Sequence, residues 1–213
     1  MIDADTFVAA DPREIAADLD GAIHLWRLPW RREQGRTPLL GLLAAYLRVA
    51  PSTLVLEEDA HGKPYLASAH TLRFNWSHSG HHAVVALTRD LELGVDIEQA
   101  REGVHVLELA QRFFSPSEAE ELAACDEAER DQLFLRLWCA KEAVLKALGR
   151  GLAFGLGRVE FALSPGGWRP VRFDAEAGAA AGWQVLRLCL GPDCPGALAW
   201  RGGPRPVLAC AAA

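Results

Sequence analysis

The sequence lacks several features that would point to a particular environment or partner. Its 213 residues include 28 Asp and Glu but only 22 Lys and Arg, so the formal net charge is −6. The basic excess typical of a nucleic-acid-binding protein is therefore missing. No apolar run reaches the roughly 18 residues that a membrane span needs. We expect neither a nucleic-acid partner nor a membrane span.

Paired cysteines and a secretion signal are also missing. No C-x-x-C occurs among the five scattered cysteines, which are Cys125, Cys139, Cys189, Cys194 and Cys210. An odd number at these spacings predicts buried, reduced thiols and argues against a zinc site. The N-terminus carries Asp3, Asp5 and Asp11 instead of a basic segment followed by an apolar one. We therefore expect no secretion signal and a cytoplasmic protein.

The composition that is present is that of an ordinary globular chain. Half of the residues are hydrophobic and 23% are charged, and the length is enough for a sizeable core. Strand and helix patterns occur on both sides of about residue 100. The sequence therefore predicts an α+β fold of two halves of similar size, 1–100 and 101–213.

The first half is predicted to begin with a loosely held acidic arm, 1–20. A helix should start at a Thr37 cap, with Pro38 in its first turn, and run to about Val49. Gly and Pro around Lys63 predict a turn over 61–66. Alternation and β-branched residues predict strands at 22–28, 54–58, 82–88 and 93–98.

The second half is predicted to begin with three helices. One covers 106–114, a second starts at the capping box Ser115–Glu118, and a third runs from about 129 to 148. Five short strands should then form an antiparallel sheet, interrupted by a loop over 175–182. Their ranges are 158–163, 168–173, 183–190, 197–200 and 207–210.

The end of the third helix carries a row of functional-group candidates. Trp138, Glu142 and Lys146 recur every four residues, so they lie along one side and drift by about 40° per step. Gly149 and Gly151 can adopt the positive φ that ends a helix. On its own, this pattern is also that of a solvated Glu–Lys pair beside a packed Trp.

Two carboxylates flank a buried position of the strand at 93–98. Asp96 and Glu98 are two residues apart, so they project from one face and can hold one hard cation. Carboxylate oxygens suit Mg²⁺, with positions left for phosphate and water. The alternative is an exposed, solvated strand face.

Polar and cationic groups cluster upstream of these carboxylates. The segment Phe74–Ser79, FNWSHS, places four polar residues just before a predicted strand, which fits either a small-anion pocket or a capped turn. They are Asn75, Ser77, His78 and Ser79. Lys63 and the arginines before the first helix are further anion-binding candidates, or else solvated charges. These arginines are Arg27, Arg31, Arg32 and Arg36. Cations, a metal grip and an orienting carboxylate together are the parts of a phosphoryl-transfer site.

Five segments then match one family in order and spacing. They are GKP at 62–64, FNWSHS at 74–79, GVDIE at 94–98, RFF at 112–114 and WCAKEAVLKALGRGL from Trp138. The chain resembles the 4′-phosphopantetheinyl transferases of the surfactin-synthetase-activating type. The resemblance implies two similar α+β halves related by a pseudo-twofold axis, with the active site between them.

The resemblance also implies the site residues. The metal ligands would be Asp96, Glu98 and Glu142, and the catalytic residues would be Glu142, Lys146 and His78. The coenzyme A contacts would include Ser77, His78, Asp96 and Lys146, with Gly62, Lys63, Pro64 and Arg32 or Arg36 at the 3′-phosphoadenosine end. Trp76 is bulkier than the aliphatic residue usual at its position.

The implied activity is Mg²⁺-dependent transfer of 4′-phosphopantetheine from coenzyme A to a serine of an apo acyl or peptidyl carrier protein. The expected form is a monomer. Arg101, Arg112, Arg150 and Arg158 are candidates for contacts with the carrier. Two alternatives stay open from the sequence: a non-catalytic member that binds coenzyme A or a carrier, and an unrelated Mg²⁺ phosphohydrolase.

Overall fold

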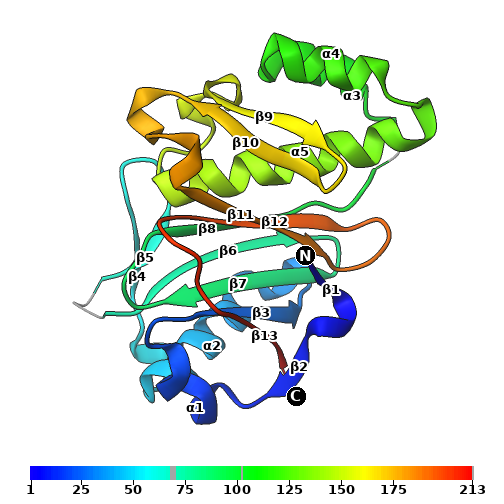
Figure 1. Cartoon of the computed structure of the whole chain (residues 1–213). Helices are drawn as coiled ribbons and strands as arrows, with labels where there is room; N and C mark the ends of the chain where they lie inside the picture. Colours follow the sequence, from blue (N-terminus) through cyan, green and yellow to red (C-terminus); the bar gives the residue numbers. More distant parts are fainter. Residues whose placement is uncertain (68–70, 102, 213) are drawn as a thin grey trace.

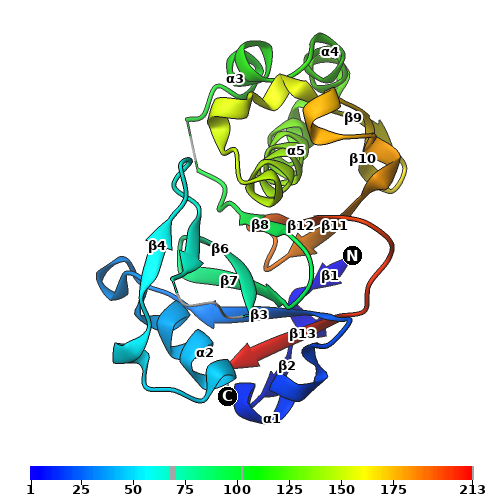
Figure 2. The same cartoon turned by 90° about the vertical axis from the view of Figure 1, so that its left-hand side faces the viewer.

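Two sheets lie face to face at the centre of the molecule, and a helix covers the outer face of each. The computed structural model describes residues 1–67, 71–101 and 103–212. Helix α5 (Glu127–Leu148) lies on the four-stranded sheet, and α2 (Thr37–Leu47) lies on the five-stranded sheet. Figures 1 and 2 show this layered arrangement from two sides. The mixed α+β class is confirmed.

The two central sheets each contain a short N-terminal strand. The five-stranded sheet has the order β2 (Val8–Ala10), β13 (Val207–Ala212), β3 (Ile23–Pro29), β7 (His82–Thr88) and β6 (Arg73–Ser79). The four-stranded sheet has the order β1 (Ile2–Asp3), β11 (Trp183–Cys189), β12 (Pro195–Arg201) and β8 (Leu93–Ile97). Strand β13 is parallel to both β2 and β3, and β1 is parallel to β11.

Smaller elements surround these layers. Two hairpin pairs are formed by β4 (Leu56–Glu58) with β5 (Pro64–Leu66), and by β9 (Val159–Ser164) with β10 (Gly167–Phe173). The remaining helices are α1 (Pro12–Ile15), α3 (Val106–Phe113) and α4 (Pro116–Ala124). Figure 2 shows α3 and α4 beyond α5, on the side away from the sheets.

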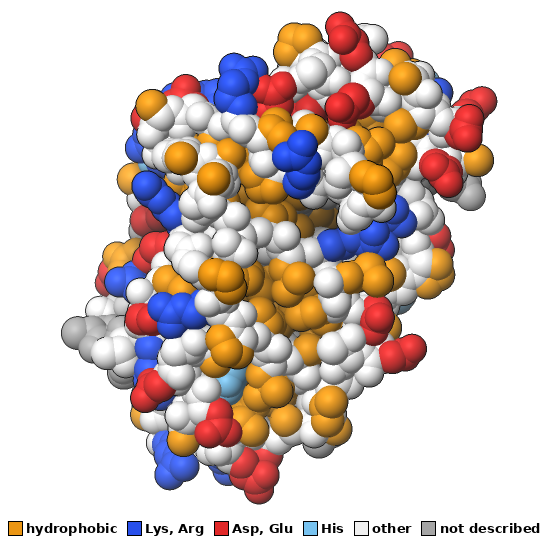
Figure 3. All heavy atoms as spheres, viewed as in Figure 1, with side chains coloured by type: hydrophobic (Ala, Val, Ile, Leu, Met, Phe, Trp, Pro, Cys, Tyr) orange, Lys and Arg blue, Asp and Glu red, His pale blue; other side chains and the backbone are white. Residues whose placement is uncertain are grey.

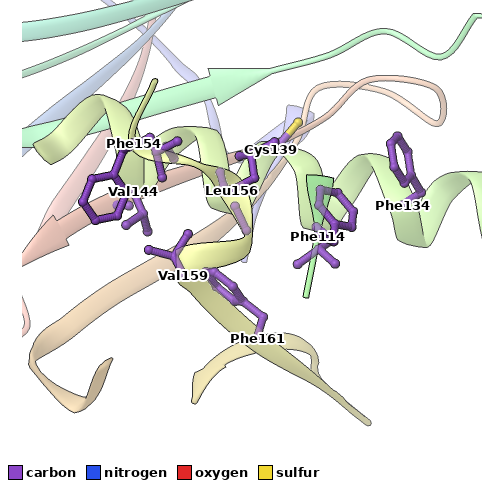
Figure 4. Close-up of a cluster of buried hydrophobic side chains, with 14 of the residues drawn as sticks. Phe114, Phe134, Cys139, Val144, Phe154, Leu156, Val159 and Phe161 are labelled. Atoms are coloured by element: carbon purple, nitrogen blue, oxygen red, sulfur yellow. The ribbon is translucent and has the colours of Figure 1, made fainter. Parts of the chain in front are cut away.

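Three apolar layers hold the fold together. One lies between α5, β9 and β12, and Figure 4 shows part of it, including Phe114, Val144 and Phe161. A second fills the space between the two sheets, and a third packs α2 on β3, β6 and β7. Burial on this scale is the main stabilising contribution in a domain of this size.

The sheets cross the boundary predicted near residue 100. Strand β8 pairs with β12, and β13 pairs with β3. The prediction that the last five strands form one antiparallel sheet is therefore wrong. Short alternating runs indicate that strands exist, but they carry no information about long-range pairing.

The acidic N-terminal arm was also predicted wrongly. Strands β1 and β2 each complete a sheet edge, and Ile2, Phe7 and Leu19 are buried. The sparse apolar residues among the acids are enough to anchor the segment, because two sheet edges are available to pair with it.

Most of the helix ends lie where the sequence predicts them. Ser115 accepts a hydrogen bond from the Glu118 amide, and Glu118 accepts one from the Ser115 amide, so the capping box is confirmed. Gly149 and Gly151 have φ of +66° and +55°. The Thr37 cap is wrong, because Thr37 lies inside α2 and Arg36 precedes it without a side-chain cap.

Two segments interpreted as turns, 61–66 and 74–79, lie at least partly in strands. Phe74–Ser79 belongs to β6, so the capped-turn interpretation is wrong, and Pro64–Leu66 forms β5 after a tight turn at Gly62. The loop over 175–182 contains two short 3₁₀ turns, with Ala177 and Ala180 buried. All five cysteines are unpaired, and three of them are buried.

The surface shows mixed chemistry. Figure 3 shows hydrophobic side chains over the middle of one face, with basic and acidic side chains interspersed around them. Among the described residues, no helix combines the length and the apolar character needed to cross a membrane.

Candidate active site

The predicted site residues meet where β6, β8 and α5 come together. A pocket of about 330 Å³ lies between these elements. Its lining residues are Trp76, Ser77, His78, Asp96, Glu98, Trp138, Glu142, Lys146 and Leu152. Segments from both halves of the sequence therefore contribute to one pocket, as the motif pattern predicts.

A glycine allows this close approach of helix and strand. A Cβ on Gly94 would lie 2.0 Å from the Ala143 carbonyl oxygen and 2.5 Å from the Ala147 nitrogen. Only glycine permits such contact between a strand and a helix backbone. As a result, the Glu142 and Lys146 side chains of α5 lie against the carboxylates of β8.

Lys146 bridges the two halves through three hydrogen bonds. Its Nζ donates to Asp96 Oδ1 at 2.7 Å, to Ser77 Oγ at 3.1 Å and to the Val95 carbonyl at 3.2 Å. The Asp96 side chain is only 5% exposed. The solvated Glu142–Lys146 pair is therefore wrong, because the ion-pair partner of Lys146 is a buried carboxylate on another element.

The pocket carries more negative than positive charge. Burial, and then the charge of Asp96, raises the pKa of Glu142 to about 7, although Lys146 opposes the shift. Burial and Asp96 also raise the pKa of Glu98. Three carboxylates beside one ammonium favour the arrival of a further cation.

Two carboxylate oxygens fit a metal ligand role. In the described part of the chain, Asp96 Oδ2 and Glu142 Oε1 are buried and have no hydrogen-bond partner. Such oxygens are suitable ligands for Mg²⁺. No three His, Cys, Asp or Glu side chains of the described residues are already grouped to hold an ion. In this arrangement Lys146 donates to Asp96 Oδ1, and Ser79 donates to Glu98 Oε2 at 3.1 Å.

His78 lies between two tryptophans at the rim of this pocket. Its ring stacks on Trp30 with centroids 3.9 Å apart, and Trp76 meets it edge-on at 4.9 Å. Burial, and then the charge of Lys146, lowers the pKa of His78. A neutral imidazole with one N–H to donate is therefore the favoured form.

Comparison with known proteins places the chain in a family. The model of the 4′-phosphopantetheinyl transferase superfamily matches residues 92–191. The 4′-phosphopantetheinyl transferase HetI of Nostoc sp. is 34% identical over 171 residues, which are 79% of this chain and 69% of HetI. The chain belongs to the 4′-phosphopantetheinyl transferase superfamily. The family and enzyme class predicted from the motifs are thereby confirmed.

Two further members of the superfamily match over shorter segments. A 4′-phosphopantetheinyl transferase of Bacillus subtilis is 35% identical over 106 residues, which are 50% of this chain and 46% of that protein. The human L-aminoadipate-semialdehyde dehydrogenase-phosphopantetheinyl transferase is 34% identical over 145 aligned residues, and the match covers 62% of this chain and 46% of that protein. The chain thus spans about half the length of these two relatives.

The upstream cations predicted to hold coenzyme A in this transferase lie outside the pocket. Lys63 pairs with Glu92 at 2.9 Å and, with Pro64, lines a neighbouring hollow of about 310 Å³. Arg36 pairs with Glu58 at 2.6 Å, and Arg32 lies on an exposed turn.

The turn at Gly62 and Lys63 nevertheless lies close to the end of α5. A Cβ on Gly149 would be 3.9 Å from Lys63 Cδ, and one on Gly151 would be 3.9 Å from the His61 carbonyl. These contacts place the turn next to the two glycines that follow α5. Its place beside the site is consistent with the predicted role.

Sequence reasoning missed a second lysine of the same helix. Lys141 is fully buried on another side of α5, and its Nζ lies 2.6 Å from Glu118 Oε1. It also donates to the carbonyls of Leu156 and Val159. The sequence predicts only a capping role for Glu118, and no spacing rule connects it to Lys141.

Proposed function

We propose that this chain transfers 4′-phosphopantetheine from coenzyme A to a serine hydroxyl of an apo acyl or peptidyl carrier protein. The reaction would release adenosine 3′,5′-bisphosphate. The observation that carries the proposal is the pocket in which Lys146, His78 and three carboxylates meet, in a chain that belongs to this superfamily. We further propose that the protein acts in the cytoplasm as a monomer.

The acidic residues of the pocket would bind the metal ion, and Lys146 and His78 would bind phosphate. Asp96 and Glu142, whose oxygens lack partners, and the adjacent Glu98 would hold Mg²⁺. When bound, Mg²⁺ supplies positive charge against the diphosphate oxygens. Lys146 and His78 lie on the same pocket and would donate hydrogen bonds to phosphate oxygens. Positioned donors of this kind stabilise the charge that develops during phosphoryl transfer.

Glu142 would orient the serine hydroxyl and accept its proton late in the reaction. Burial raises the pKa of Glu142 to about 7, which is well placed for proton transfer near neutrality. A bound cation would shift Glu142 toward its ionised form. A loose phosphoryl-transfer transition state requires little deprotonation of the nucleophile at the start. Near-normal turnover of Glu142→Gln with unchanged Mg²⁺ dependence would contradict both the ligand role and the proton-acceptor role.

Asp96→Ala should raise the Mg²⁺ requirement. It should also lower the rate by about 10²-fold or more, the size typical of losing one catalytic group. A steady-state titration of Mg²⁺ at saturating coenzyme A measures both effects. An unchanged Mg²⁺ requirement would remove Asp96 from the ligand set.

The carrier would dock over a groove next to the catalytic pocket. This groove has a volume of about 230 Å³, and Glu98 and Trp138 line both spaces. Its other lining residues are Gln99, Arg101, Val104, Leu109, Phe134 and Leu135. A largely apolar groove with one arginine at its edge suits an acidic partner that presents an apolar contact.

The other predicted docking arginines differ in their partners. Arg150 pairs with Glu176, and Arg158 pairs with both Glu176 and Asp174, so two carboxylates offset the charge of these two arginines. Arg112 lies over the Phe113 ring on α3. We therefore assign the charge contact with the carrier to Arg101. Arg101→Glu should raise KM for the carrier more than it changes kcat, while Arg150→Glu serves as the matched control.

Mass spectrometry separates this proposal from its alternatives. Incubation with coenzyme A, Mg²⁺ and an apo carrier should add about 340 Da to the carrier, the mass of the transferred group. A non-catalytic binding protein would leave the carrier unchanged and coenzyme A intact. A phosphohydrolase would consume coenzyme A without a carrier. Absence of any mass gain across acyl and peptidyl carriers would refute the transferase proposal.

A further inference from the structure

Strands β6 and β8 lie side by side without a backbone ladder between them. β8 pairs with β12 on one side only, and β6 pairs with β7 on one side only. Side chains of β6 make the connection instead. The Val95 amide donates to Asn75 Oδ1 at 2.8 Å, and the Gln99 amide donates to Ser79 Oγ at 2.9 Å.

The Ile97 amide, between those of Val95 and Gln99, also bonds to a side chain of β6. The Ile97 amide donates to Ser77 Oγ at 3.4 Å, a longer contact. Every second residue of β6 from Asn75 to Ser79 thus faces every second amide from Val95 in β8 to Gln99, just after β8. Val95 and Ile97 are 0% exposed, so water does not reach these amides. Buried amides require a partner, and for Val95 and Ile97 the partners are the side-chain oxygens of Asn75 and Ser77. Gln99 is an exposed residue, and its amide bonds to Ser79.

The two serines also reach the candidate metal ligands. Ser77 Oγ donates to Asp96 Oδ1 at 2.9 Å, and Ser79 Oγ donates to Glu98 Oε2 at 3.1 Å. A hydroxyl can donate one hydrogen bond while it accepts others. Ser77 therefore joins the Ile97 amide of β8 to Asp96, and Ser79 joins the Gln99 amide, just after β8, to Glu98.

This arrangement specifies the register of β8. A slip by one residue would bring Trp76 and His78 opposite the amides and would turn Asp96 and Glu98 to the other face. The turn after β6 adds a steric constraint at the end of the row. A Cβ on Gly80 would lie 1.6 Å from Gln99 Oε1, so Gln99 packs directly on Gly80.

We propose that Asn75, Ser77 and Ser79 form a polar seam that holds β8 in register, and that Ser79 is the positioning residue that aims Glu98 at the cation. The part that concerns the cation rests on the proposed function. The part that concerns the register does not.

Amide exchange in the full chain, without metal or coenzyme A, tests the register. Ser79→Val and Ser79→Thr have the same shape and differ only by the hydroxyl. The Gln99 amide should exchange about tenfold faster in the Val variant, since it loses one hydrogen bond. Val95 should keep its protection there and lose it in Asn75→Leu. Equal exchange of Gln99 in the Val and Thr variants, or a uniform rise over all amides, would overturn the seam.

Binding of Mn²⁺ in the presence of coenzyme A, followed by electron paramagnetic resonance, tests the positioning role. Removal of a group that orients a metal ligand typically costs about 10–100-fold in metal affinity. Ser79→Val should show such a loss and Ser79→Thr should restore the affinity. Ser79→Ala repeats the test without added methyl groups, in case Val prevents folding. Equal Mn²⁺ affinity with and without the hydroxyl would overturn the positioning role.

Thr88→Val provides the matched control. Thr88 is a buried hydroxyl residue at the end of β7, and its Oγ1 donates to Asp90 Oδ1 at 3.1 Å. It should leave both the Gln99 amide and Mn²⁺ affinity unchanged. The exchange measurement is independent of transfer, so a wild-type chain that adds no mass to any carrier would refute the proposed function while leaving the seam standing.

Discussion

Two lysines of α5 form ion pairs of almost the same length but in different surroundings. Lys141 lies 2.6 Å from Glu118, and both side chains are 0% exposed. Lys146 lies 2.7 Å from Asp96, and its side chain is 27% exposed. One helix therefore carries a closed pair and a pair that opens onto a pocket.

The closed pair has its hydrogen-bonding capacity filled by the protein. Lys141 also donates to the carbonyls of Leu156 and Val159, while Glu118 accepts from the amides of Phe161 and Ser115. Burial lowers the pKa of Lys141 to about 8, and Glu118 opposes that shift. This pair ties α5 to α4 and β9, and it offers nothing to a ligand.

The open pair leaves oxygens available. Asp96 Oδ2 and Glu142 Oε1 are buried without partners in the described part of the chain, next to the pocket. An ion pair with free oxygens and access to a cavity is arranged for a ligand, and a fully bonded ion pair is arranged for structure. The distinction depends on neighbours from other elements and not on the helix itself.

Breaking the closed pair should give the largest effect. Lys141→Met leaves the Glu118 carboxylate buried without its counter-charge, so the free energy of unfolding should fall by about 3–5 kcal/mol. Chemical denaturation of the purified chain measures this change. Adding Glu118→Gln removes the unpaired charge and keeps an acceptor for the Phe161 amide, so it should recover part of the loss. A single variant as stable as the wild type would contradict the structural role.

Breaking the open pair should affect activity more than stability. Lys146→Met removes the proposed phosphate contact, and transfer should slow by about 10²-fold or more. The free energy of unfolding should change less than in Lys141→Met, because Asp96 can be hydrated from the pocket. Parallel rate and denaturation measurements on the two variants compare these sites directly. Equal losses of stability in Lys141→Met and Lys146→Met would contradict the difference between the closed and open pairs.

Gly94→Ala should disturb the open pair and leave the closed pair intact. The added Cβ would collide with the backbone of α5 beside Asp96, at a cost of about 1–3 kcal/mol for overpacking. Lys141 lies on another side of the helix and should keep its partner. The variant should thus remain folded and lose transfer activity. Wild-type activity in Gly94→Ala would show that the close approach is dispensable.

His24 should give the smallest effect and provides a reference outside both pairs. It is 0% exposed, its Nδ1 lies 2.7 Å from the Tyr46 hydroxyl, and burial lowers its pKa from 6.5. Below pH 6.5 the unfolded chain binds a proton that the folded chain resists, so stability should fall as the pH drops through this range. His24→Asn should flatten this part of the stability–pH curve. Identical curves for the two chains would refute the assignment.

The sequence predicted most of the elements and the metal-ligand candidates. Local signals were enough for the capping box at Ser115, the stop at Gly149 and the strand that carries Asp96. Spacing also placed Glu142 and Lys146 on one side of a helix. The resemblance connected these segments, and the structure brings them to one pocket.

Long-range partners could not be predicted from local pattern. The pairing of β13 with β3, the contact of Lys141 with Glu118 and the ion pair of Lys146 with Asp96 each join distant segments. The period-two spacing of Asn75, Ser77 and Ser79 was a missed signal. Read as a strand with a polar edge, it would have predicted β6 and indicated a facing strand.

The open pair should take part in the transfer reaction, and the closed pair should only stabilise the fold. The most direct measurement is the initial rate at which an apo carrier gains about 340 Da with coenzyme A and Mg²⁺, normalised to the folded fraction of each enzyme. The wild type and the folded part of Lys141→Met with Glu118→Gln should transfer at similar rates, and Lys146→Met should be slower by about 10²-fold or more. Wild-type rates in Lys146→Met would contradict the account.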